Sequence, residues 1–158
     1  MRLLNESLTA CTRKLGALLL FGLAVASPAA AQKFNPTSFK LDNGLEVVVI
    51  ENHRAPAVTQ MLYYKVGSAD EEPGKGGLAH FLEHLMFKGT KKHPLGEFSG
   101  LVAKHGGREN AFTSQDTTGY WQRVASDRLE MIMELEADRM INLVLAEEVV
   151  LSERDVIL

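Results

Sequence analysis

The sequence has a single cysteine, Cys11, and no cysteine after it. A disulfide framework is therefore excluded, and so is a thiolate nucleophile or metal ligand anywhere beyond that residue. Long apolar runs are also missing: the run at residues 15–25 is too short to span a bilayer as a permanent helix. Positive charge is scarce, with 17 Lys and Arg against 20 Asp and Glu. Nothing therefore suggests a nucleic acid or an anionic membrane as a partner.

Residues 1–31 are interpreted as a secretory signal peptide. Basic residues precede the apolar run, and three alanines at 29–31 offer a cleavage site before Gln32. We expect cleavage, no stable membrane anchor, and export across the inner membrane to the periplasm. The leader holds three of the 17 basic and one of the 20 acidic residues, so residues 32–158 carry 14 and 19, a net charge of −5.

Residues 76–88 predict a helix with two chemically different faces. Apolar residues recur at the spacing of a helix that packs on a core, at Leu78, Phe81, Leu82, Leu85 and Met86. His80, Glu83 and His84 fall on roughly the opposite face. Two histidines one turn apart can each direct a nitrogen at a single zinc ion, and the glutamate between them lies near enough to act on a water molecule.

The order H-x-x-E-H is the zinc-peptidase motif called inverzincin. On the motif alone a second interpretation stays open, since three polar residues can simply be solvated on an exposed helix face. The rest of the chain has to decide between the two.

The remaining pattern predicts an α+β fold, a mixed or antiparallel sheet packed with helices. Asn43-Gly44 is a hairpin signal between strand-like runs. Strands are expected at 39–41, 45–50, 58–66, 108–114 and 117–125, and further helices at 95–105, 127–145 and 146–158. In the helix at 127–145 we expect the core face to carry Leu129, Met133, Ala137, Met140 and Val144.

Two further ionisable residues are candidates for a role. Glu153 lies on the apolar face of the last helix with Val149 and Val156, where a carboxylate is costly unless it is paired or near a metal. His105 is a conceivable third ligand, but the glycines that follow it favour a helix end.

At this point the sequence resembles the pitrilysin family of zinc peptidases, which includes insulin-degrading enzyme and the mitochondrial processing peptidase; the bacterial, smaller-subunit branch is most similar. The resemblance rests on several motifs in order: L-x-N-G-L-x-V-V at 41–48, V-G-S at 66–68, G-L-A-H-F-L-E-H-L-M-F-K-G-T at 77–90, G-G-x-x-N-A-F-T-S-x-D-x-T-x-Y at 106–120, L-E-A-D-R-M at 135–140 and S-E-R-D-V-I-L at 152–158. Residues 32–158 would then be an incomplete N-terminal peptidase domain.

The resemblance implies that His80 and His84 bind one zinc ion, that Glu83 is the general base, and that Glu153 supports the site from behind the ligands. If a residue within this chain has to substitute as the third ligand, Glu153 is the first candidate. It also implies that a peptide substrate adds as an extra strand along four residues, Asn110, Ala111, Phe112 and Thr113. The family's third ligand, a glutamate, is expected just beyond Leu158. A second homologous half or subunit is expected to close the chamber.

The resulting expectation is a zinc metalloendopeptidase that hydrolyses peptides or unfolded polypeptides, with the 158-residue chain alone being an inactive fragment. The alternative is a noncatalytic family member that acts in binding or assembly. Such members usually have a degraded zinc motif, whereas His80, Glu83 and His84 are all present.

Overall fold

The computed structural model describes residues 35–157. The expected signal peptide at 1–31 lies outside the described residues. The chain divides into two compact units, one up to residue 52 and one from residue 53 onward, and each is described by itself. Among the described residues, no helix combines the length and the hydrophobicity needed to cross a membrane.

The first unit holds an antiparallel hairpin of β1 (Thr37–Lys40) and β2 (Glu46–Val49), with Thr37 opposite Val49. Its turn lies where the sequence predicts it. Gly44 adopts a φ of 89°, and the Asn43 side chain accepts a hydrogen bond from the main-chain N–H of Leu45 at 3.0 Å. Glycine supplies the positive φ without steric cost, which is why this dipeptide closes the hairpin.

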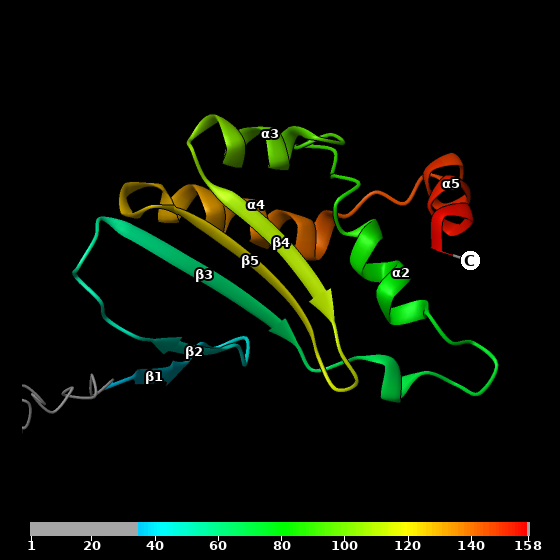
Figure 1. Ribbon diagram of the computed structural model, residues 1–158, viewed down its shortest axis with the longest axis horizontal. Helices are drawn as coiled ribbons and strands as arrows, with labels where there is room; N and C mark the ends of the chain where they lie inside the picture. Colours follow the sequence, from blue (N-terminus) through cyan, green and yellow to red (C-terminus); the bar gives the residue numbers. More distant parts are fainter. Residues whose placement is uncertain (1–34, 158) are drawn as a thin grey trace, which may run out of the picture. The chain divides into compact units, whose positions relative to one another are not determined.

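The second unit is built on a three-stranded antiparallel sheet in the order β3-β5-β4. The strands are β3 (Ala57–Tyr64), β4 (Arg108–Thr113) and β5 (Thr118–Ala125), so β4 is an edge strand. Four helices accompany the sheet: α2 (Leu78–Leu85), α3 (Glu97–Lys104), α4 (Leu129–Asn142) and α5 (Glu147–Ile157) (Figure 1). Short 3₁₀ turns, η2 (Ser68–Asp70) and η3 (Ser126–Arg128), precede α2 and α4. The expected α+β fold with antiparallel pairing is confirmed.

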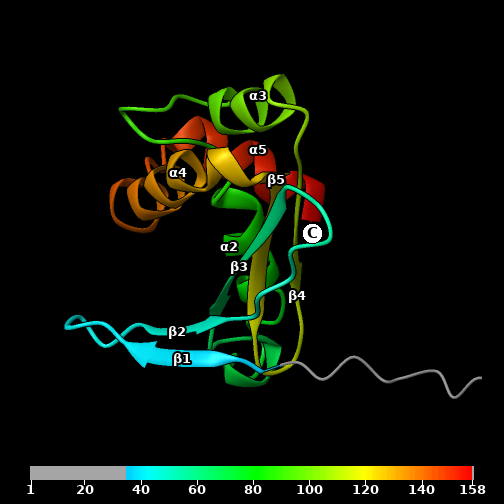
Figure 2. The ribbon, with the colours of Figure 1, turned by 90° about the vertical axis from the view of Figure 1, so that its left-hand side faces the viewer.

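The core lies between the helices and one face of the sheet. Helix α4 packs against β3 and β5, and Figure 2 shows it on one side of β5. The buried apolar cluster consists of Phe98 and Val102 from α3, Val124 from β5, and Ile132 and Leu135 from α4. Successive side chains of a strand point to opposite faces of the sheet, so Tyr120, Gln122 and Val124 all point to the helix side. This alternation places Val124 in the cluster.

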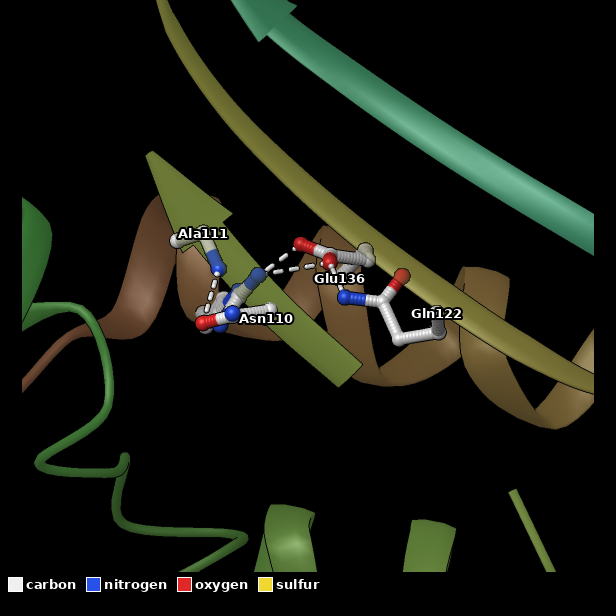
Figure 3. Close-up of polar contacts among 5 residues, drawn as sticks. Asn110, Ala111, Gln122 and Glu136 are labelled. Atoms are coloured by element: carbon white, nitrogen blue, oxygen red, sulfur yellow. Dashed lines mark hydrogen bonds and ion pairs between the residues drawn. The ribbon is translucent and has the colours of Figure 1, made fainter. Parts of the chain in front are cut away.

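The predicted core face of α4 is wrong. Its buried residues are Ile132, Leu135, Glu136 and Arg139, whereas Met133 is 56% exposed. The inward face carries an ion pair that hydrophobicity alone does not identify. Glu136 accepts hydrogen bonds from Arg139 at 2.6 and 2.7 Å and from the Gln122 side chain at 2.6 Å, which crosses from β5 to α4 (Figure 3).

Aromatic rings enclose the buried guanidinium of Arg139. It lies 4.5 Å from the ring centre of Tyr120, 4.6 Å from that of Phe98 and 5.3 Å from that of Phe87. Phe87 lies two residues after the last residue of α2. The stacked arginine therefore ties α4 to the sheet and to the end of α2, and so helps to position that helix.

Candidate functional site

Helix α2 begins at a carboxylate supplied from the preceding loop. Gly77, with a φ of 95°, precedes the helix, and Glu71 accepts hydrogen bonds from the main-chain N–H groups of Gly77 at 2.9 Å and Ala79 at 2.8 Å. These bonds, that from Ala79 first, lower the pKa of the Glu71 carboxyl. Glu71 thus satisfies two of the donors that a helix leaves free at its start.

The predicted apolar face of α2 is buried only in part: Leu85 and Met86 are buried. Leu78 and Leu82 are 53% and 47% exposed, whereas Glu83 is only 8% exposed. The face that carries Glu83 and His84 lies against β4 and α5, and Figure 1 shows α2 between these two elements. Polar partners on those elements make this burial possible, and the apolar spacing gave no sign of them.

The two histidines of α2 direct nitrogens at each other. The Nε2 atoms of His80 and His84 are 3.1 Å apart, and the ring planes are perpendicular. Two nitrogens that bind one tetrahedral zinc ion at about 2.1 Å lie about 3.4 Å apart. The observed separation is therefore close to the one that a shared zinc ion requires.

Glu153 on α5 fixes the orientation of one of these rings. Its Oε1 lies 2.6 Å from Nδ1 of His84, and its Oε2 forms an ion pair with the Lys88 ammonium. A proton on Nδ1 donated to this carboxylate leaves the lone pair of His84 on Nε2, the atom that faces His80. The hydrogen bonds from Lys88 and then from His84 lower the pKa of the Glu153 carboxyl.

Lys88 is a residue that sequence reasoning missed. Its ammonium pairs with the buried carboxylate of Glu153. Its place four residues after His84, about one helical turn further along the chain, was the available signal.

The third polar residue of α2 faces the sheet. The Thr113 hydroxyl, at the end of β4, donates a hydrogen bond to Oε2 of Glu83 at 2.5 Å. The carboxylate thus lies on the same helix as both histidines and is held from the edge strand.

The open edge of β4 exposes main-chain groups at alternate residues. The hairpin to β5 closes with the Ser114 N–H donating to the Thr117 oxygen at 2.8 Å. Counting back along the antiparallel pair, the main-chain groups of Ala111 and Thr113 face away from β5. Accordingly, the Ala111 N–H donates to Oδ1 of its own neighbour Asn110 at 2.9 Å (Figure 3). Release of that bond would let the outward-facing main-chain groups of Ala111 and Thr113 pair with an added strand.

Two other features do not contribute to this site. His105 forms the C-terminal end of α3, as the structural interpretation expected. A cavity of about 220 Å³ is lined by Lys88, Glu153 and residues of α5, but not by the histidines or Glu83.

Within residues 35–157, no cluster of three or more His, Cys, Asp or Glu side chains is arranged to hold a metal ion. The described residues therefore bring together two histidines that could share a metal ion, and no third side chain of that kind beside them.

Comparison with known proteins gives consistent matches. The family model described as insulinase (peptidase family M16) matches residues 46–158. A protein named zinc protease PqqE from Helicobacter pylori is 40% identical over 144 residues, 90% of this chain and 32% of the relative. Human insulin-degrading enzyme is 38% identical over 92 residues, 58% of this chain and 9% of the enzyme.

A solved structure is similar too. The crystal structure of a protease from Helicobacter pylori superimposes with a TM-score of 0.75 at 41% identity, over 78% of this chain and 30% of that one. The chain spans about a third of the length of these bacterial relatives.

Proposed function

The chain belongs to the insulinase family of peptidases, family M16, and we propose that it forms the zinc-binding part of a metalloendopeptidase acting on peptides or unfolded polypeptides. The family resemblance inferred from the spaced motifs is thereby confirmed. The observation that supports the activity best is the 3.1 Å approach of the His80 and His84 Nε2 atoms on the helix that also carries Glu83.

His80 and His84 would hold one zinc ion, and relatives carrying the name zinc protease support this choice of metal. When bound, the ion would supply positive charge that acidifies water and polarises the scissile carbonyl. Imidazole nitrogens suit zinc, and catalytic zinc sites commonly have three protein ligands. We propose that an acidic residue about two turns beyond Glu153, on a continuation of α5, provides the third.

Glu83 would act as the general base. Its carboxylate takes a proton from the attacking water and returns it to the amine that leaves when the peptide bond breaks. Its position one residue before His84 keeps the Glu83 carboxylate within reach of a water molecule bound at the histidines. The side chain is only 8% exposed, and this burial restricts its motion.

The substrate would bind as a strand added to β4, along Asn110, Ala111, Phe112 and Thr113. The outward-facing main-chain groups of Ala111 and Thr113 support this mode, because pairing through them is largely independent of the substrate's side chains. Asn110 would have to release the Ala111 N–H as the substrate strand pairs.

Three broader proposals follow from the sequence. A second homologous half or subunit would close the chamber over β4, and residues 1–31 would direct the protein to the periplasm. Residues 1–158 alone would bind zinc weakly, because two histidines without an acidic third ligand form an incomplete site. Zinc at one ion per chain after dialysis of that fragment would contradict this last proposal.

The alternative is a noncatalytic subunit. The presence of both histidines, the glutamate and the supporting Glu153 contact disfavours it.

The proposed activity is tested by removing and restoring zinc. A chelator should stop cleavage of an unstructured peptide by the full-length protein, and added zinc should restore it in the wild type but not in His84→Ala. Cleavage that persists without metal, or in His84→Ala, would contradict a zinc mechanism and support a different catalytic apparatus.

A further inference from the structure

We propose that Thr113 is a positioning residue: its hydroxyl holds the Glu83 carboxylate in the orientation needed for proton transfer, so that the strand expected to bind the substrate also orients the general base. This inference rests on the proposed peptidase function. Thr113 then has a side-chain role in addition to its main-chain role in substrate pairing.

The contact is specific in its geometry. The Thr113 hydroxyl lies 2.5 Å from Oε2 of Glu83, and the two residues are 30 positions apart in the chain. A nearly buried carboxylate needs hydrogen-bond donors, and within residues 35–157 the Thr113 hydroxyl is the donor that Glu83 meets. A glutamate side chain has several rotatable bonds, and this bond selects one orientation among them.

The position of Thr113 in the sheet lets the residue contact both Glu83 and an added strand. Along β4, the half-buried side chains of Glu109, Ala111 and Thr113 alternate with exposed ones, so the Thr113 side chain points to the helix side. Its main-chain groups meanwhile face the open edge of the sheet. One residue therefore touches the base with its side chain and can touch an added strand with its backbone.

The chemical consequence concerns the two oxygens of Glu83. Oε2 accepts the Thr113 hydroxyl proton as a hydrogen bond without taking it, which leaves Oε1 to accept the proton of water and later release it to the amine. Because the base is anchored to β4, a peptide paired with β4 would present its scissile bond in a fixed register to Oε1.

Thr113→Val and Thr113→Ser in the full-length, zinc-loaded protein separate the hydroxyl from the shape of the side chain. Valine keeps the shape and removes the donor, so kcat should fall by about 10- to 100-fold with KM unchanged. Serine keeps the donor and should retain most of kcat. Zinc content should equal that of the wild type in both variants.

Thr118→Val is a matched control. Thr118 lies opposite Thr113 on β5 and is buried. Its hydroxyl donates a hydrogen bond to the main-chain oxygen of Val66 at 3.0 Å rather than to Glu83. Loss of the Thr118 hydroxyl should lower thermal stability and leave kcat per folded molecule unchanged. An equal loss of kcat in Thr118→Val would assign the effect to the strand as a whole and overturn the proposal.

Two measurements do not depend on turnover. A crystal structure of Thr113→Val should show the Glu83 carboxylate in more than one orientation, against a single one in the wild type. In a Glu83→Gln background, where a peptide binds without being cleaved, Thr113→Val should leave the peptide Kd unchanged.

Several outcomes would overturn the proposal: an unchanged kcat in Thr113→Val, a serine variant as slow as the valine variant, a weakened peptide Kd, or an unmoved Glu83 carboxylate. If instead the wild type shows no zinc-dependent cleavage, the proposed function fails, while the crystal structures still decide whether Thr113 orients Glu83.

Discussion

The Nδ1 atom of His84 lies 2.6 Å from Oε1 of Glu153, which is 69 residues further along the chain. This contact joins α2 to α5 and directs the free nitrogen of His84 toward His80. A carboxylate behind a metal-binding histidine commonly fixes the ring and strengthens the ligand. This contact explains why a carboxylate, that of Glu153, lies on the apolar face of α5: it orients the His84 ring.

Replacing Glu153 should therefore weaken zinc binding. We expect Glu153→Gln in the full-length protein to lower zinc affinity by about 10- to 100-fold, because the amide neither carries the charge that pairs with Lys88 nor orients the ring as strongly. Competition with a chromogenic chelator measures the affinity. Glu148→Gln, an exposed change on the same helix, is the control; an equal loss in both variants would count against a specific role for Glu153.

Glu71 should stabilise the start of α2 in a pH-dependent way. Its folded-state pKa is lowered by the main-chain bonds from Ala79 and Gly77, so its contribution is present above the ordinary glutamate pKa and is lost as pH falls through the lowered value. Glu71→Gln should lower the thermal midpoint at neutral pH, and the difference from wild type should shrink in acid. Glu72→Gln, next in sequence and paired only at the surface with Lys75, should change little. A pH-independent difference for Glu71→Gln would contradict this role.

The Arg139 pair should be important for folding. Both side chains of the Arg139–Glu136 pair are almost fully buried, and Arg139→Ala would leave the Glu136 carboxylate without its cation. The expected cost is about 3–5 kcal/mol in the free energy of unfolding, measured by urea denaturation. Arg128→Ala, which removes an exposed partner 3.6 Å from Asp127, should cost less than about 1 kcal/mol. Similar losses in the two variants would show that burial of the Arg139 pair does not matter.

Local patterns in the sequence predicted much of the fold and the site. The Asn43-Gly44 turn needs only a glycine with positive φ, and the i, i+4 spacing of His80 and His84 is itself enough to bring their nitrogens together. The anomaly of Glu153 was visible because a carboxylate in an apolar stripe needs a partner, and the structure supplies His84 and Lys88.

Long-range polar partners could not be predicted in the same way. The inward face of α4 was misassigned because Glu136 and Arg139 satisfy each other inside the core, so the buried face is not the most apolar one. The Thr113 contact to Glu83 depends on where the end of β4 meets α2, and no local spacing encodes that meeting. Tertiary packing decides both.

The central claim is that His80 and His84 hold zinc while Glu83 acts as the base, and the Glu83→Gln variant of the full-length protein tests it most directly. Zinc content and cleavage of an unstructured peptide should be measured on the same preparation. The account predicts zinc bound as in the wild type with turnover abolished, because glutamine cannot accept the proton of water. Cleavage retained by the zinc-loaded Glu83→Gln variant would contradict it.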